Sequence, residues 1–341
     1  ERSVELFETL FMPREIRNEQ LKTLAKLVKP TEEDLKRLTR IIVVPGYLAN
    51  FLSLLASPAW LDLLKDSKLL DLPKVQTWWV GHSFVRALKD TYPEEVLRTL
   101  EHLFSKSDKN FEGVYSIGIA THDLGSIARP LLLECLNLFP AQIADVAIDE
   151  IQNGKPSDDF VCDIGSIILN PSIPSTAYYS EPLFDALALG VDEKNCQDRI
   201  KMLVSVIKKI PQSDHPWSRL IFDRGISVSD ERNFYGYQDG MQIVQTLTRI
   251  IKDAVPFISP HDLSTLTATL PDIVKDRIVP WALTQLTNAT AEDFFAEIYN
   301  GISSRLSSVD DISLVDKLLA TVDQNECVPR LRNIYGSPPT I

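Results

Sequence analysis

The sequence predicts an all-α fold of about 15 short helices with little or no β-structure. Helix-start signals followed by apolar residues at helical spacing recur along most of the 341 residues. Runs that alternate between apolar and polar residues, which are typical of a half-buried strand, are scarce. The chain has only 13 glycines but 21 prolines. This balance favours many short helices, each begun or ended by a proline, over the glycine-rich loops of a doubly wound α/β enzyme.

The expected helices begin at capping residues or at prolines. Thr31 precedes three acidic residues, which interact favourably with the positive end of a helix dipole. Ser57 followed by Pro58 predicts a cap and then a first helical residue. Two further starts have a serine or threonine three residues before an aspartate, the spacing of a capping box. These two starts are Ser259 and Thr290, and further helices are expected to begin at Pro93 and Pro140.

Apolar residues spaced three, four or seven apart then give each helix one face for the core. The helix after Pro93 has Val96, Leu100 and Leu103 on this face. The most regular stripe is Cys196, Ile200, Leu203, Val204 and Ile207. Such helices are stable only when neighbouring helices cover their apolar faces.

Two segments could also form strands. Residues 226–229 alternate between apolar and polar types, and residues 160–169 form an apolar run. The second segment follows Ser157, Asp158 and Asp159, which predict the start of a helix, so we expect a helix there. No Asn-Gly or Asp-Gly turn joins two alternating runs, so no β-hairpin is expected.

The helices are expected to form pairs, at about 78–104, 111–138 and 140–169. An aromatic residue followed by proline starts a helix at Pro93 and again at Pro140, 47 residues later. A repeated helix–turn–helix unit favours an α-solenoid over a compact bundle. In this pairing and spacing, over about 70–300, the sequence resembles the HEAT/armadillo class of α-helical repeats. The resemblance implies a superhelix of stacked helix pairs that offers an extended binding surface.

A second resemblance involves the stretch from 58–61 through 70–73 to Trp78 and Trp79. This stretch is similar to helical-repeat regions of large bacterial multidomain proteins, some of them defence NTPases. We therefore expect one elongated array over 1–341, with a sub-boundary near 170–192, where turns rich in proline and serine occur. Because the chain begins with glutamate and ends in a linker-like Ser-Pro-Pro string, we expect it to be a piece of a longer protein.

Charge and cysteine use narrow the class of protein. A net charge of −12 disfavours nucleic acid as the main partner, because that role usually requires a basic stripe. No apolar run approaches the roughly 18 residues needed to cross a bilayer, and no signal peptide is recognised. The cysteines are far apart, as is typical of thiols in a reducing compartment: Cys135, Cys162, Cys196 and Cys327. We expect a cytoplasmic protein that makes no membrane contact.

No residue pattern in the sequence predicts a metal or nucleotide site. His82, His102 and His122 lie 20 residues apart, but they lack the i, i+4 partners typical of metal ligands. Gly113 and Gly118 stand among helical residues, without the third glycine and the strand that a dinucleotide site requires. We expect no metal and no cofactor.

The candidate catalytic groups have structural explanations as well. Asp158 with Asp159, and Asp310 with Asp311, could act as paired carboxylates, but both pairs stand where helices are expected to begin. Cys135 could act as a nucleophile, yet leucines surround it in sequence, which predicts a small buried side chain. We expect no catalytic residue in this chain.

One segment combines the residue types of binding hot spots. Between 214 and 237, large aromatic and arginine side chains gather in a polar, turn-rich context. The candidate partner-binding residues are Trp217, Arg219, Arg224, Tyr235 and Tyr237. The alternative is that Trp217 and Phe234 belong to the core, while the two arginines pair with Asp214 and Asp223.

The sequence thus predicts a non-catalytic scaffold for protein interaction or sensing. Its expected partner is another protein or another domain of the parent chain. One alternative is a nucleic-acid-binding α-solenoid, and a helical enzyme is the third hypothesis. In the nucleic-acid alternative, one of two basic groups lines a common face: Lys22, Lys26 and Lys29, or Lys208 and Lys209.

Overall fold

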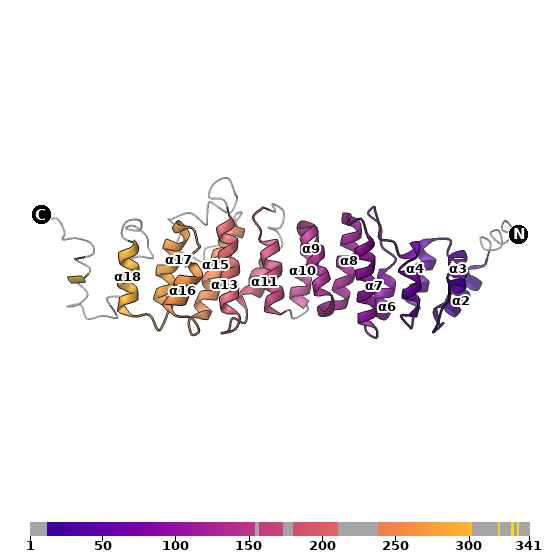
Figure 1. Cartoon of the computed structure of the whole chain (residues 1–341), viewed down its shortest axis with the longest axis horizontal. Coiled ribbons are helices and arrows are strands. Elements are labelled where there is room, and N and C mark those ends of the chain that lie inside the picture. Colours follow the sequence, from indigo (N-terminus) through magenta and orange to yellow (C-terminus); the bar gives the residue numbers. More distant parts are fainter. Residues whose placement is uncertain are drawn as a thin grey trace. The chain divides into compact units, whose positions relative to one another are not determined.

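The computed structural model describes residues 12–153, 157–172, 180–210 and 238–301, with Ala320, Pro329, Arg330 and Asn333. Internal contacts divide the chain into two units, Glu1–Pro156 (unit 1) and Ser157–Ile341 (unit 2). The secondary structure of the described residues consists of helices joined by loops, with no strand among them (Figure 1). The expected all-α fold is therefore confirmed for them. The expectation of a single array over 1–341, with a sub-boundary near 170–192, stays a prediction.

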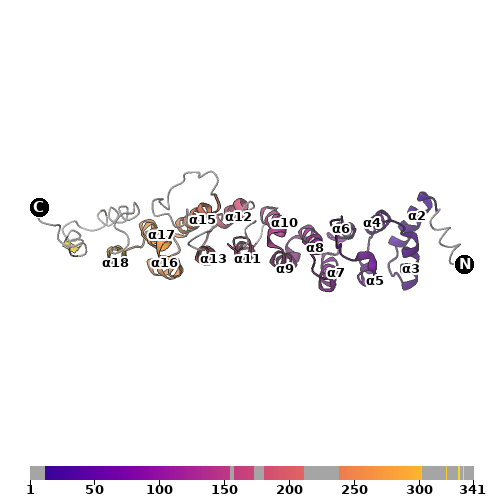
Figure 2. The same ribbon diagram turned by 90° about the horizontal axis from the view of Figure 1, so that it is seen from above.

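The helices of unit 1 pack in two rows. The first row is α2 (Arg14–Ala25), α4 (Pro45–Ser53), α6 (His82–Leu88), α8 (Phe111–Leu124) and α10 (Pro140–Asn153). The second is α3 (Glu32–Ile41), α5 (Ala59–Leu64), α7 (Pro93–Lys106) and α9 (Arg129–Leu138), with the 3-10 helices η1 (Lys68–Leu70) and η2 (Gly125–Ala128). Each first-row helix contacts the next one in its row, and α3 contacts α5, which contacts α7. Figure 2 shows α4, α6 and α10 on one side and α5, α7 and α9 on the other.

Unit 2 has the same alternation. Its described helices are α11 (Asp158–Ile168), α12 (Ser180–Ala188), α13 (Cys196–Lys209), α15 (Gln238–Ala254), α16 (Pro260–Thr267), α17 (Asp272–Gln285) and α18 (Ala291–Gly301). One row contacts in the order α11, α13 and α16, and the other in the order α12, α15 and α17. The expected pairs at 78–104 and 111–138 correspond to α6 with α7 and α8 with α9, each in contact. The third expected pair is divided, because α10 belongs to unit 1 and α11 to unit 2.

The predicted caps at Thr31, Ser259 and Thr290 are present, and each forms a capping box. Thr31 accepts a hydrogen bond from the Asp34 amide, and the Asp34 side chain accepts one from the Thr31 amide. Ser259 and Thr290 form the same reciprocal bonds with the aspartate three residues later. Each cap satisfies amides at a helix start that would otherwise lack a partner, and such a cap contributes about 1 kcal/mol.

Two proline positions differ from the prediction. α5 begins at Ala59, so Pro58 is the capping residue rather than the first helical residue. Pro280 lies inside α17, although prolines were expected only where helices start or stop. An interior proline costs about 3 kcal/mol. Burial of its neighbours Ile278, Val279 and Ala282 offsets that cost.

The predicted apolar faces form the core. All five residues of the stripe from Cys196 to Ile207 are buried, and residues 160–169 form α11 and its end rather than a strand. In unit 1, Trp60 is fully buried, packs edge-on against Phe51 at 5.0 Å and donates a hydrogen bond to the Leu24 carbonyl. None of the described helices combines the length and apolar character that crossing a lipid bilayer requires.

Candidate interaction surface

The partner-binding residues predicted from sequence lie outside the described residues. Trp217, Arg219, Arg224, Tyr235 and Tyr237 all belong to 211–237. Their role in binding stays a prediction, as does the alternative that Trp217 packs in the core and the two arginines pair with aspartates.

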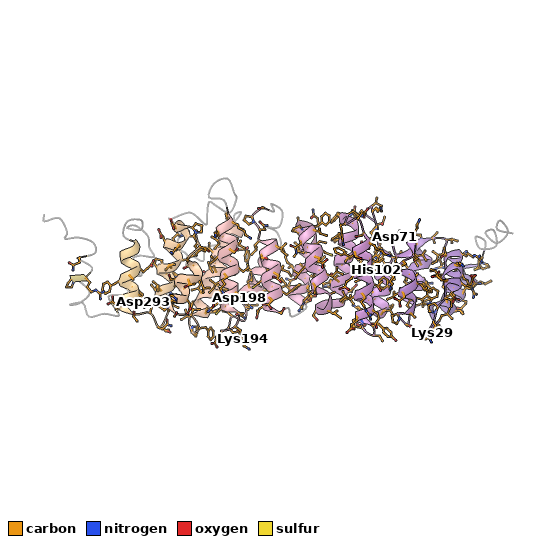
Figure 3. All side chains as sticks on the ribbon, viewed as in Figure 1. Lys29, Asp71, His102, Lys194, Asp198 and Asp293 are labelled. Carbon is orange, nitrogen blue, oxygen red and sulfur yellow. The ribbon has the colours of Figure 1, made fainter. Side chains whose placement is uncertain are left out.

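The three histidines contact different partners. His102 of α7, which Figure 3 labels, has Nε2 3.0 Å from Asp66 Oδ1. His122 of α8 has Nε2 2.7 Å from Asp149 Oδ2 of α10. His82, the first residue of α6, is buried. Within the described ranges, no three His, Cys, Asp or Glu side chains gather closely enough to hold a metal ion.

Asp158 has a partner that the sequence did not reveal. Its carboxylate accepts hydrogen bonds from the Arg199 guanidinium and from the Asn195 amide, 3.1 Å away. Burial raises the pKa of Asp158, but these two hydrogen bonds outweigh it and hold the pKa below its ordinary value. Asp159 is exposed, and residues 310 and 311 lie outside the described ranges. Asp158 therefore joins α11 to α13 in addition to standing at a helix start.

Cys135 and the two helical glycines are packing residues. Cys135 is fully buried, and burial raises the pKa of its thiol to about 12, so the nucleophilic thiolate is disfavoured. A Cβ added to Gly113 would lie 3.2 Å from Leu72 Cβ, and one added to Gly118 would lie 3.2 Å from Ile143 Cδ1. Both glycines allow close approach of neighbouring elements.

The lysines of the nucleic-acid alternative have local explanations. Lys22 pairs with Glu19 at 2.8 Å within α2. Lys208 and Lys209 stand in the last turn of α13, where the helix dipole favours positive charge. The other two are exposed and belong, like Lys22, to unit 1: Lys26 and Lys29.

The largest exposed apolar side chain in the described part of the chain is Trp78. It is 60% exposed, and Val75 nearby is 66% exposed. Both belong to segment 71–81, which starts at Asp71 (Figure 3) and joins η1 to α6. We call Val75 and Trp78 the Trp78 surface. Lys74 of the same segment pairs with Asp108 at 3.1 Å, which links the segment to the loop before α8.

The residue after Trp78 anchors this segment to the core. Trp79 is only 3% exposed, and its Nε1 donates a hydrogen bond to the Leu70 carbonyl at 3.3 Å. Its ring packs edge-on against Phe84 at 6.0 Å. A Cβ added to Gly81 would lie 2.2 Å from a Trp79 ring atom, so only glycine leaves room for that ring. The anchor presents Trp78 to solvent in a defined position.

His82 lies directly beneath the Trp78 surface. It is 5% exposed, with its ring centroid 6.2 Å from that of Trp78 and 5.4 Å from that of Trp79. Its Nδ1 is buried and has no hydrogen-bond partner among the described residues. Burial lowers the pKa of His82; Asp123 acts in the opposite direction and Arg86 in the same direction.

No aromatic residue lines either of two surface pockets of unit 1. One of about 340 Å³ is lined by five residues of α2 and by Arg37 of α3. The other, of about 260 Å³, lies between the start of α5 and α7. Its charged residues pair along their own helices, Asp62 with Lys65 and Glu95 with Arg98. This arrangement is typical of a solvated groove.

The sequence did contain a signal for the Trp78 surface. Trp78 and Trp79 are adjacent, and adjacent side chains of an extended segment point to opposite sides. An extended segment places one indole inside and the other outside, whereas the helix pair expected at about 78–104 begins at these residues. Comparison with protein-family models, curated proteins and solved structures finds no match for this chain. The resemblance to HEAT/armadillo repeats stays a prediction.

Proposed function

We propose that this chain is a non-catalytic protein-interaction scaffold built as an α-solenoid of stacked helix pairs. The observation that carries the proposal is the two-row packing, in which helices of both units contact the helix after next. Stacked repeats bury their apolar faces against neighbours and leave their outer faces free to bind a partner.

Side-chain pairs between successive first-row helices support this proposal. Asn50 of α4 donates to Asn18 of α2 at 3.3 Å, and Lys89, the residue after α6, pairs with Asp123 of α8 at 3.2 Å. The His122–Asp149 pair then joins α8 to α10. Because each pair joins neighbours within one row, the pairs stabilise stacking without occupying the Trp78 surface.

We propose that a partner protein binds the Trp78 surface. Tryptophan is enriched at the hot spots of protein interfaces, because burying its large ring contributes much of the binding energy. The net charge of −12 favours a protein over nucleic acid as the partner. The residues from Trp217 to Tyr237 are proposed as a second contact region.

A cytoplasmic location is part of the same proposal. Cys135, Cys162 and Cys196 are free thiols. Reducing compartments keep such thiols unpaired.

The test compares partner capture by the wild-type chain with capture by Trp78→Ala. Phe257→Ala is the matched control, because Phe257 is an exposed aromatic residue of unit 2. For a hot spot of about 2 kcal/mol, Trp78→Ala weakens binding about 30-fold, while Phe257→Ala leaves it unchanged. Both variants should keep the melting temperature within a few degrees, because exposed substitutions usually cost less than about 0.5 kcal/mol.

Capture is measured by quantitative mass spectrometry on extracts of the native host. Equal recovery of every specific protein by wild type and Trp78→Ala would contradict a role for this surface. Recovery of nucleic acid that falls steeply with salt would instead favour the nucleic-acid alternative.

A further inference from the structure

We propose that His82 is a pH-sensitive latch: its neutral imidazole holds segment 71–81 in place, and its protonation releases the segment together with the Trp78 surface. The consequence, that acid weakens partner binding, rests on the function proposed above. The latch itself is a property of the described residues and can be tested without a partner.

The geometry around His82 makes the charged imidazole unfavourable. A protonated imidazole donates from both ring nitrogens. Its Nδ1 is buried and faces no acceptor among the described residues, so protonation would place an unpaired, charged donor in the core. The rings of Trp78 and Trp79, both within 6.2 Å of the imidazole, offer no carboxylate or carbonyl acceptor on their side chains.

The charged groups near His82 compensate this cost only in part. Asp123 of α8 favours protonation, but its carboxylate already pairs with Lys89 at 3.2 Å. Arg86, one turn after His82 in α6, opposes protonation.

The other elements packed against α6 add little. α4 has no charged residue, and the charged side chains of α7 are exposed or half-exposed. In the segment itself, Asp71 is exposed and Lys74 is occupied by Asp108.

The direction of the pH dependence follows from the lowered pKa of buried His82. An unfolded histidine titrates near about 6.5. Above that pH both the closed and the released forms hold a neutral imidazole, and the latch is fully effective. Below it, the released form binds the proton more readily. The closed form then loses up to about tenfold in relative population for each pH unit, until the lower pKa of the closed form is reached.

Release is expected to be local, because Trp79 is the one buried side chain of the segment and its ring centroid lies 5.4 Å from that of His82. Residues 71–81 form no helix, and their attachments include the Trp79–Leu70 hydrogen bond and the exposed Lys74–Asp108 pair. Segments with few buried contacts open more readily than the surrounding helices.

The other two described histidines of unit 1 provide controls. His102 and His122 each lie beside an aspartate oxygen, at 3.0 and 2.7 Å. Protonation there creates a donor that already has an acceptor, so no comparable release is expected. Only His82 combines burial with an unpartnered Nδ1 in the described part of unit 1.

Hydrogen–deuterium exchange of the full chain at pH 7.5 and 5.5 tests the latch, with labelling times corrected for the pH dependence of intrinsic exchange. In wild type, peptides covering 71–88 should exchange several-fold faster at pH 5.5, up to about tenfold, while peptides of α13 should not. His82→Gln should abolish the pH effect, and His102→Gln should retain it. His82→Phe, which keeps an aromatic ring, replaces His82→Gln if circular dichroism shows that the latter has not folded.

Absence from the wild type of a pH-dependent change in exchange confined to 71–88 would overturn the proposal. So would an unchanged response in the His82 variants. Failure of the latch leaves the capture experiment with Trp78→Ala unaffected. Conversely, a latch that responds to pH while Trp78→Ala captures normally would contradict only the proposed function.

Discussion

Replacing Arg199 by methionine is expected to destabilise unit 2 by about 2–4 kcal/mol. Arg199 of α13 is only 4% exposed. Its Nη1 donates to the carbonyls of Leu187 and Leu189 at 2.7 and 2.6 Å, and its Nη2 donates to Asp158. One side chain therefore joins the end of α12 and the start of α11 to α13. Methionine preserves most of the apolar contact while removing the hydrogen bonds and the charge.

The expected destabilisation follows from the hydrogen bonds that each partner of Arg199 loses. The Leu187 carbonyl lies in a buried contact, and an unsatisfied buried acceptor costs about 1–3 kcal/mol. Leu189 is largely exposed and the Asp158 side chain is about half exposed, so water can replace part of their lost bonds. The expected loss is therefore smaller than the roughly 3–5 kcal/mol typical when a fully buried ion pair is broken.

Thermal unfolding followed by circular dichroism measures the effect. For a unit of this size, about 2–4 °C are lost per kcal/mol, which corresponds to a decrease of roughly 10 °C. Arg249→Met is the matched control, because Arg249 pairs with Asp185 at 3.4 Å and both side chains are more than half exposed. Its expected effect is below about 1 kcal/mol. If Arg199→Met lowers the melting temperature no more than Arg249→Met does, the reasoning about this buried cluster is wrong.

Two other predictions concern the caps and the buried thiol. Thr31→Ala and Ser259→Ala should each cost about 1 kcal/mol, measured by urea unfolding, because each removes the hydroxyl that accepts a hydrogen bond from the backbone amide of the aspartate three residues later. Exposed Thr39→Ala serves as the control for Thr31→Ala, and equal losses would contradict the capping role. Cys135 should resist a thiol reagent at pH 8 in the folded protein and react after denaturation, since burial raises its pKa to about 12. Rapid labelling of Cys135 in the folded state, located by mass spectrometry, would disprove this.

The features predicted correctly from the sequence are those determined within one turn of helix. The Thr31, Ser259 and Thr290 caps each involve a hydrogen bond between residues three apart, so the sequence contains both partners side by side. Apolar stripes such as that of α13 are likewise local, because the helix period alone decides which residues share a face. Pro280 is an exception to these local rules, because it lies inside a helix. Packing of its neighbours outweighs its cost inside a helix, and that packing comes from other helices.

The features that were missed depend on pairs far apart in sequence. Asp158 was correctly read as an acid at a helix start, yet its contact with Arg199 spans 41 residues and that with Asn195 spans 37. Contacts between stacked helices of unit 1 span shorter separations: 27 residues for His122 with Asp149 (149 − 122), 32 for Asn18 with Asn50 and 34 for Lys89 with Asp123. The sequence repeat is instead predicted from the separation of 47 residues between Pro93 and Pro140. That separation is longer than the separation of the residues in any of these contacts. The number of residues between successive helices of a row therefore determines which distant side chains meet when the helices pack.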